Sequence, residues 1–273
     1  MRIIIKIITY SFLIVLSLSF VFPFLWMILS SFKANKEVLA IPVTILPEIW
    51  TIDAYLNLAS YANYDFPRYI FNSIFTTIVA VLLAVILCTT AGYGFAKYKF
   101  PGNSFLFFFV LSTIMIPFQA IVVPLFILMK DLGLQNSYLG LIIPESLTAF
   151  GVFLMRQFFY SIPDEIIESA RIEGASEFRI FWSISLPLAK TAIFALIIFH
   201  SQWVWNLLLW PLIIISSPEM RTIPQAISLF SGVYFTPYPE QLAISVLACL
   251  PLLALFSILS KNFIKGITLT GLK

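Results

Sequence analysis

The sequence has little charge for its length. Only 11% of the 273 residues are Asp, Glu, Lys or Arg, whereas 60% are hydrophobic and 28 are phenylalanine. A water-soluble domain of this size needs a larger charged surface, so the composition excludes an ordinary soluble protein. It also leaves no room for a separate soluble catalytic domain. We therefore expect one membrane domain over residues 1–273.

Residue types that build metal and catalytic sites are also scarce. The two cysteines, Cys88 and Cys249, lie in apolar stretches, and the single histidine, His200, has no metal-ligand spacing to either of them. We expect no metal site and interpret both thiols as packing residues. The sequence also lacks a cluster of residues that could act together in catalysis, which argues against a membrane-embedded enzyme.

A phosphate-binding loop for ATP is missing as well. Such a loop needs the pattern G-x-x-x-x-G-K-[ST] after a strand. Gly266 and Gly271 have the required separation, but Leu272 stands where the lysine belongs. We therefore expect no cofactor on this chain and no enzymatic activity of its own.

Long apolar runs make up most of what the sequence does contain. A helix needs roughly 20 apolar residues to cross about 30 Å of hydrocarbon. The runs that satisfy this length are 7–32, 70–96, 104–129, 138–160, 189–215 and 240–262. The sequence thus predicts an all-α polytopic membrane protein with six transmembrane helices and both termini on the same side.

Basic residues are distributed unevenly between the two sides of this arrangement. With the N-terminus in the cytoplasm, eleven of the 16 Lys and Arg fall on the cytoplasmic side. This excess matches the positive-inside bias, so we expect both termini to be cytoplasmic. The cytoplasmic set is Arg2, Lys6, Lys97, Lys99, Arg156, Arg171, Arg179, Lys190, Lys261, Lys265 and Lys273.

One polar island, residues 161–187, interrupts the apolar runs. Ser161 is expected to cap a helix that ends near Glu173. Gly174 then supplies the positive φ of a turn, and Ser176 caps a second helix. We call this predicted helix–turn–helix segment the elbow, and the charge bias places it in the cytoplasm. Its predicted apolar stripes are Ile166, Ile167 and Ala170 on the first arm, and Phe178, Phe181 and Ile184 or Ser185 on the second.

The elbow resembles the EAA loop of ABC importer permeases. That loop reads E-A-A-x-x-x-G and closes with I-x-L-P, and only Ser169 departs from the pattern here, as one small residue in place of another. The matching residues are Glu168, Ser169, Ala170, Gly174, Ala175, Ile184, Leu186 and Pro187. By this resemblance they form the segment that couples the permease to an ATPase.

Further motifs are similar to permeases of carbohydrate importers of the maltose-transporter type, and among these to the six-helix partner of a permease heterodimer. They are Pro23-Phe24-Leu25-Trp26, Ser31-Phe32-Lys33, Asn72-Ser73, Ala91-Gly92-Tyr93, Phe100-Pro101-Gly102, Ile116-Pro117, Pro124-Leu125, residues 153–157, Trp205-Asn206 and the tail 266–273. The resemblance implies a type I ABC importer permease in a bacterial-type cytoplasmic membrane.

The resemblance also implies partners and a cargo. A second permease subunit would complete the path, two cytoplasmic ATPase subunits would bind ATP and Mg, and an extracytoplasmic binding protein would deliver a sugar or oligosaccharide. Membrane lipid surrounds such a protein, and no nucleic acid is involved. The outer loops 33–69 and 216–239, the second of which holds Tyr234 and Phe235, either contact the binding protein or only pack against the partner permease.

Polar residues within the spans are the candidates for a substrate path, because they are costly in hydrocarbon. This set is Gln119, Glu145, Gln202, Trp205 and Asn206, with His200, Trp203 and Trp210 nearby in the sequence. Each also has a structural explanation. Gln119 and Asn206 fit helix-bridging hydrogen bonds, Glu145 fits a carboxylate at a helix N-terminus, and the tryptophans fit an interfacial belt.

Two other interpretations stay open at this point. A related permease carries a non-sugar solute such as glycerol 3-phosphate, although no basic cluster lies in the spans. An ion-coupled secondary transporter would show internal repeats and ionisable residues near the membrane midplane, and neither is evident. The sequence does not identify the cargo.

Overall fold

The computed structural model describes residues 2–60, 65–229 and 237–270. Every regular element in these ranges is a helix, so the all-α prediction is confirmed. The chain divides into two compact units, which we describe one at a time. Unit 1 comprises residues 1–68 and 226–251, and unit 2 comprises residues 69–225 and 252–273.

The helices agree with six membrane spans. Within the described ranges, three helices are long and apolar enough to cross a membrane: α1 (Arg2–Ser30), α4 (Phe66–Lys97) and the Tyr238–Lys261 part of α15 (Tyr238–Thr270). Three bent helix pairs bring the total to six when each pair is one span. The predicted number of spans is therefore confirmed.

The third predicted span, 104–129, is broken rather than continuous. It consists of α5 (Asn103–Ser112), the 3-10 turn η1 (Thr113–Met115) and α6 (Phe118–Asp131), and its two halves meet at 103°. Pro117 has no N–H to continue the helix, and it forces Ile116 into an extended conformation with φ −83° and ψ 115°. The break follows from this one proline.

The fourth and fifth spans are also interrupted. The fourth joins α7 (Tyr138–Ile142) and the 3-10 turn η2 (Ile143–Glu145) to α8 (Ala149–Tyr160), with a bend of 42°. The prediction of one helix over 189–215 is wrong, because α12 (Lys190–Trp205) stops before α13 (Leu209–Ile214). Pro211 lacks the N–H that would continue the helix to the carbonyl of Leu207. Short helices η4 (Pro218–Met220) and α14 (Ile223–Leu229) follow.

Unit 1 shows that the predicted outer loop 33–69 has structure of its own. It contains α2 (Asn35–Val38) and α3 (Asp53–Ser60). Lys33 is 1% exposed, lies 4.6 Å from the Trp26 ring centroid and donates a hydrogen bond to the carbonyl of Thr44. The buried Lys33 side chain therefore connects the segment around Thr44 to the end of α1. Tyr234 and Phe235 of the other predicted loop lie outside the described residues.

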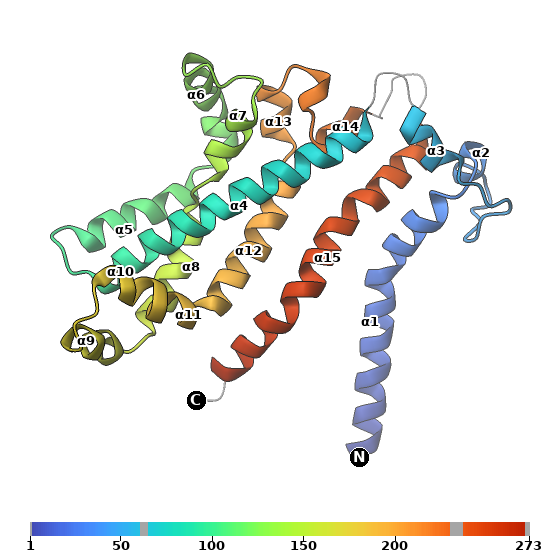
Figure 1. The fold of residues 1–273 in the computed structure, drawn as a ribbon. Helices are drawn as coiled ribbons and strands as arrows, with labels where there is room; N and C mark the ends of the chain where they lie inside the picture. The colour runs from blue at the N-terminus through green and yellow to red at the C-terminus, as the bar shows by residue number, and fades with distance from the viewer. Residues whose placement is uncertain (1, 61–64, 230–236, 271–273) are drawn as a thin grey trace. The chain divides into compact units, whose positions relative to one another are not determined.

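Unit 2 is organised around the close approach of α4 and α8. A Cβ placed on Gly92 would lie 2.6 Å from the Cβ of Met155, and one on Gly151 would lie 2.6 Å from Sγ of Cys88. Cys88 and Met155 are fully buried, which agrees with a packing role for that thiol. Figure 1 shows the elbow helices at the end of this unit where α4 and α8 terminate, and α6, α7 and α13 at the opposite end.

Candidate functional site

The elbow folds around a left-handed glycine. Its first helix, α9 (Asp164–Ile172), ends at Glu173, and Gly174 has φ +84°. The N–H of Gly174 donates to the carbonyl of Arg171 and the N–H of Ala175 to that of Ala170, each at 3.0 Å. These two bonds form a Schellman motif, which favours glycine at this position. The predicted turn is confirmed.

Only backbone conformation limits substitution at Gly174. A Cβ built there meets no atom of the described chain within 4 Å, so a side chain would cause no steric clash. The positive φ alone disfavours other residues.

The capping predictions at the two helices have different outcomes. Ser161 does not cap α9, because the helix begins only at Asp164, and the Ser161 hydroxyl donates to the carbonyl of Phe158 at the end of α8. Pro163 occupies the capping position instead. Ser176 accepts a hydrogen bond from the N–H of Arg179 at 3.4 Å and caps α10 (Glu177–Ile180) as predicted.

The second arm of the elbow continues directly into the next span. After α10, one π-helical segment, η3 (Phe181–Ser185), leads into α11 (Leu186–Leu188), and the chain then bends by 73° into α12. The π-helical turn is short, as such segments usually are, and π-bulges are frequent at functional sites. The second arm of the elbow and α12 thus form one of the three bent helix pairs.

Ion pairs tie the elbow together and to the end of α4. Arg171 binds Glu177 across the turn with two hydrogen bonds of 2.6 and 3.1 Å, and the Tyr98 hydroxyl donates to the same carboxylate at 2.8 Å. Lys97 binds Asp164 and the carbonyl of Ile162, both at 2.6 Å. Arg171 and Lys97 hold the pKa values of the Glu177 and Asp164 carboxyls below their ordinary range.

The contact between Tyr98 and the elbow gives a prediction for alkaline pH. Burial, followed by the hydrogen bond to Glu177, raises the pKa of Tyr98 to about 12. Since this lies above the unfolded value of about 10, the stability that it contributes is present below about pH 10 and is lost as the pH rises through about 12. The tyrosinate absorbance of the wild type minus that of Tyr98→Phe should show one titration near pH 12. A midpoint near 10 would contradict the contact.

The residues of the EAA-like pattern divide into exposed and buried groups. Glu168 is exposed and lines a cavity of about 300 Å³ with Lys97, Tyr98, Lys99, Asp164, Ile167 and Arg171. Ser169 donates its hydroxyl to the carbonyl of Ile166 at 3.1 Å. Ala170 is buried, Ala175, Ile184 and Leu186 pack against the same core, and Pro187 is exposed. The pattern thus holds the elbow on unit 2 and leaves Glu168 accessible.

An exposed apolar surface on the elbow differs from the predicted stripes. Ile167, Ala170, Phe181 and Ser185 are buried, whereas Ile166 is 40% exposed. The outward residues are Ile172 (88% exposed), Phe178 (73%) and Trp182 (49%), and we call these three the apolar patch. The Phe178 and Trp182 ring centroids are 5.9 Å apart. The i, i+4 spacing of Phe178 and Trp182 was the one feature of the sequence that could have predicted their contact on the same helix face.

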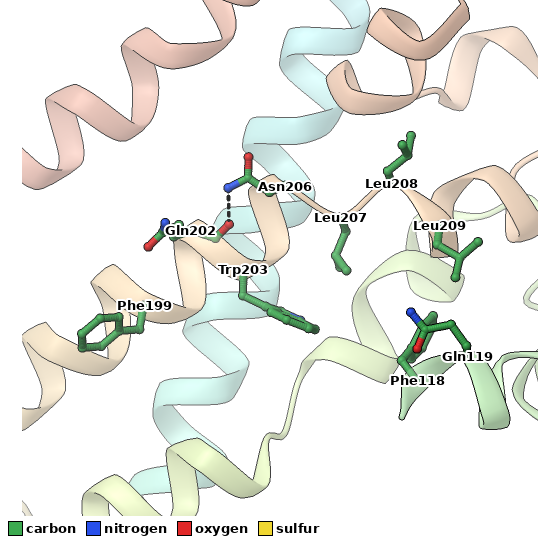
Figure 2. Close-up of a pocket in the computed structure, with 9 residues that line it drawn as sticks. All are labelled: Phe118, Gln119, Phe199, Gln202, Trp203, Asn206, Leu207, Leu208 and Leu209. Atoms are coloured by element: carbon green, nitrogen blue, oxygen red, sulfur yellow. Dashed lines mark hydrogen bonds between the residues drawn. The ribbon is translucent and has the colours of Figure 1, made fainter. Parts of the chain in front are cut away.

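Figure 2 shows the first of two further cavities described in unit 2, which has a volume of about 440 Å³. Three of the predicted path residues, Gln119, Gln202 and Asn206, line it together. Trp203 points from α12 toward the segment that carries Phe118 and Gln119. The remaining lining residues are Phe199, Leu207, Leu208 and Leu209. Asn206 donates to the carbonyl of Gln202 at 2.7 Å, so its hydrogen bond caps its own helix and does not bridge two helices.

The second cavity, of about 730 Å³, contains Glu145 and shares Phe118, Phe199 and Trp203 with the first. Glu145 is 7% exposed, and its Oε2 accepts a hydrogen bond from Nε1 of Trp203 at 2.9 Å. Glu145 lies in the first turn of η2, as the helix-N-terminal interpretation requires, but this three-residue helix directly follows α7 and ends at Glu145. Its carboxylate instead orients the indole ring between the cavities.

The other aromatic and histidine candidates are part of the packing. Trp205 is buried and lines neither cavity. Trp210 is fully buried and donates to the carbonyl of Gly140 at 2.9 Å. Nε2 of His200 lies 2.8 Å from the carbonyl oxygen of Glu145 and connects α12 to η2. Within the described residues, no group of three His, Cys, Asp or Glu side chains has metal-site geometry.

Comparison with known proteins identifies related chains. Residues 88–269 match the family described as "Binding-protein-dependent transport system inner membrane component". The arabinooligosaccharides transport system permease protein AraQ of Bacillus subtilis (strain 168) is 36% identical over 96% of this chain and 94% of its own length. The lactose transport system permease protein LacG of Rhizobium radiobacter is 30% identical over 95% and 94%.

A solved structure has the same fold. It is a chain from the crystal structure of a bacterial ABC transporter involved in the import of the acidic polysaccharide alginate. The TM-score is 0.82 over 95% of this chain and 96% of that chain, with 24% sequence identity. This similarity covers nearly the whole of both chains, so the overall fold is a known architecture.

Proposed function

Because the chain belongs to the family of inner membrane components of binding-protein-dependent transport systems, we propose that it is a permease subunit that forms half of the import path for a sugar or oligosaccharide. A second permease would supply the other half. Two ATPase subunits would bind ATP and Mg in the cytoplasm, and an extracytoplasmic protein would deliver the cargo. The arrangement of Trp203 with three amide side chains carries the assignment of the cargo.

The first cavity has the groups that sugars need. The amides of Gln119, Gln202 and Asn206 each offer donors and acceptors to hydroxyl groups. The Trp203 side chain is 57% exposed, and its ring face suits the C–H surface of a pyranose or furanose. The names of the relatives support this cargo class, since they specify arabinooligosaccharides, lactose and diacetylchitobiose.

The lining of both cavities argues against a phosphorylated cargo. Of the described residues around them, none is Lys or Arg. A phosphate entering such a cavity would lose its hydration without gaining a cation, and a buried unpaired charge is strongly unfavourable. A glycerol 3-phosphate permease is therefore the weaker alternative, unless the second permease provides the positive charge.

The elbow supports coupling to an ATPase. Its apolar patch of Ile172, Phe178 and Trp182 is exposed, as is the Glu168 side chain, and aromatic residues of this kind often anchor protein interfaces. The Schellman turn and the Arg171–Glu177 pair hold both arms in a fixed relation. We propose that the elbow lies in the cytoplasm and binds one ATPase subunit through this surface.

Uptake by the assembled complex tests the proposal. The complex with its ATPase and binding protein should take up one of three neutral probes, arabinotriose, lactose or diacetylchitobiose, in an ATP-dependent manner. Trp203→Ala should reduce that uptake about fivefold or more, because it removes an aromatic contact worth about 1 kcal/mol and leaves the Glu145 carboxylate without its hydrogen bond from Trp203. Phe105→Ala, at an exposed aromatic that lines neither cavity, is the matched control and should transport normally.

Three results would refute parts of the proposal. Uptake of glycerol 3-phosphate but of no sugar would reject the cargo class. Uptake by this chain alone, driven by an ion gradient, would reject the importer. Equal transport by Trp203→Ala and the wild type would remove Trp203 from the path.

A further inference from the structure

Arg156 on α8 has a buried guanidinium nitrogen with no hydrogen-bond partner among the residues that the structure describes. Its Nε is buried and makes no hydrogen bond, and within the described residues the guanidinium forms no ion pair. Arginine carries five N–H donors and keeps its charge in proteins. Since nearly all buried donors in folded proteins are paired, the unpaired Nε of Arg156 requires an explanation.

Aromatic rings hold this guanidinium in place. Its central carbon lies 4.0 Å from the ring centroid of Phe107 and 5.6 Å from that of Tyr160. Phe107 is itself buried, with its ring centroid 5.6 Å from that of Phe95 and 6.5 Å from that of Phe153. Cation–π contacts of this kind position the charge and leave its N–H donors free for an anion.

The backbone of Arg156 is fixed as well. A Cβ on Gly92 would lie only 2.8 Å from the Arg156 nitrogen, so α8 rests directly on α4 at this point. Neighbouring Met155 is fully buried. The guanidinium is therefore presented from a rigid helix and not from a mobile surface side chain.

We propose that Arg156, between Phe107 and Tyr160, binds the phosphate of an anionic membrane lipid. Arg156 lies four residues before the end of a helix that belongs to a membrane span, about 6 Å from the last residue, Tyr160. Because this position is close to the elbow end of a span, we expect lipid headgroups beside it. The planar guanidinium suits two parallel hydrogen bonds to phosphate oxygens.

The surroundings favour a lipid over a carboxylate of another protein chain. Helix α5, which carries Phe107, exposes Phe105 and Phe108 (both 71%), and Tyr160 is 67% exposed. Such a surface suits acyl chains below a bound headgroup, and Tyr is typical of the interface. A protein carboxylate would have to lose its water among these rings, whereas a lipid phosphate already lies at that boundary. The proposal depends on membrane location and not on the cargo.

Lipid selectivity of the purified complex tests this proposal. The whole complex is reconstituted in phosphatidylcholine with trace spin-labelled phosphatidylglycerol or spin-labelled phosphatidylcholine, and the immobilised fraction is measured. The wild type should prefer phosphatidylglycerol about tenfold, because hydrogen bonds to a charged group are among the stronger ones. Arg156→Gln should lose this preference. Arg179→Gln removes an equal charge from an exposed position of the elbow and should keep it.

A conservative variant keeps the test decisive. Arg156→Lys retains the positive charge but loses the planar guanidinium that can donate two parallel hydrogen bonds. It should therefore show an intermediate preference for phosphatidylglycerol, even if Arg156→Gln fails to assemble. An unchanged preference in these variants would overturn the proposal. So would displacement of the labelled lipid by millimolar inorganic phosphate, which would identify a free-anion site. Loss of the second permease from Arg156→Gln with lipid preference intact would instead identify a protein partner.

Discussion

Phe178→Asp should abolish ATP-driven uptake while the permease remains folded in the membrane. Phe178 is 73% exposed, so a carboxylate there disturbs no core packing. In a complex with an ATPase the same carboxylate would be buried without a partner next to the Trp182 ring. Truncating a residue at such a position costs about 2 kcal/mol or more, which weakens binding at least about 30-fold. Co-purification of the ATPase with the permease measures this loss.

The conservative change Phe178→Leu is the control for this prediction. It preserves an apolar side chain and should retain most of the bound ATPase and most of the uptake. Ile172→Asp, at the most exposed residue of the patch, should behave like Phe178→Asp. Wild-type amounts of ATPase on both aspartate variants, together with normal transport, would show that the ATPase binds elsewhere.

Gly92→Ala should destabilise the permease by about 1–3 kcal/mol, the usual cost of overpacking a core. The added Cβ would lie 2.6 Å from the Cβ of Met155 and 2.8 Å from the nitrogen of Arg156. Neither atom belongs to the flexible end of a side chain, so α4 and α8 must move apart. The unfolding temperature in detergent should fall, and the yield of monodisperse protein should fall with it.

Gly94→Ala, two residues further along the same helix, provides the matched comparison. A Cβ there meets no atom within 4 Å, so the substitution adds only the better helix propensity of alanine, up to about 1 kcal/mol. The two variants should therefore shift the unfolding temperature in opposite directions. Equal shifts would mean that helix propensity, and not the contact between α4 and α8, determines the result.

The sequence was sufficient for features that depend on local chemistry. Six apolar runs of adequate length were enough to predict six spans, because the thickness of the membrane sets the length of a crossing helix. The turn at Gly174 was also predictable, since the Schellman motif requires a residue that accepts positive φ. Ser161 shows the limit of this reasoning. Several residues near a helix start can act as a cap, and Pro163 determines where α9 begins.

Features that depend on packing were harder to predict. The average hydrophobicity of a segment does not show where a helix breaks. The 103° bend at Pro117 was therefore not predicted within the continuous apolar run 104–129. For a related reason, the sequence did not indicate that Trp203, and not Trp205, lines the two cavities. Composition cannot say which side of α12 meets another helix, although Phe199, Trp203 and Asn206 have the spacing of one helix face. The orientation of the Glu145 side chain was not predictable either, because it depends on a hydrogen bond from Trp203, which lies 58 residues away in the sequence.

Because the second arm of the elbow continues directly into α12, a rotation at the elbow would displace the far end of α12. Trp203 lies 13 residues beyond Lys190, where α12 begins, which corresponds to about 20 Å along the helix axis. If α12 turns by about 10° as a rigid rod about the bend at Ala189, the indole travels about 3.5 Å by simple geometry. That is more than the diameter of a water molecule. A modest rotation at the elbow is thus enough to widen or close the cavity beside Trp203.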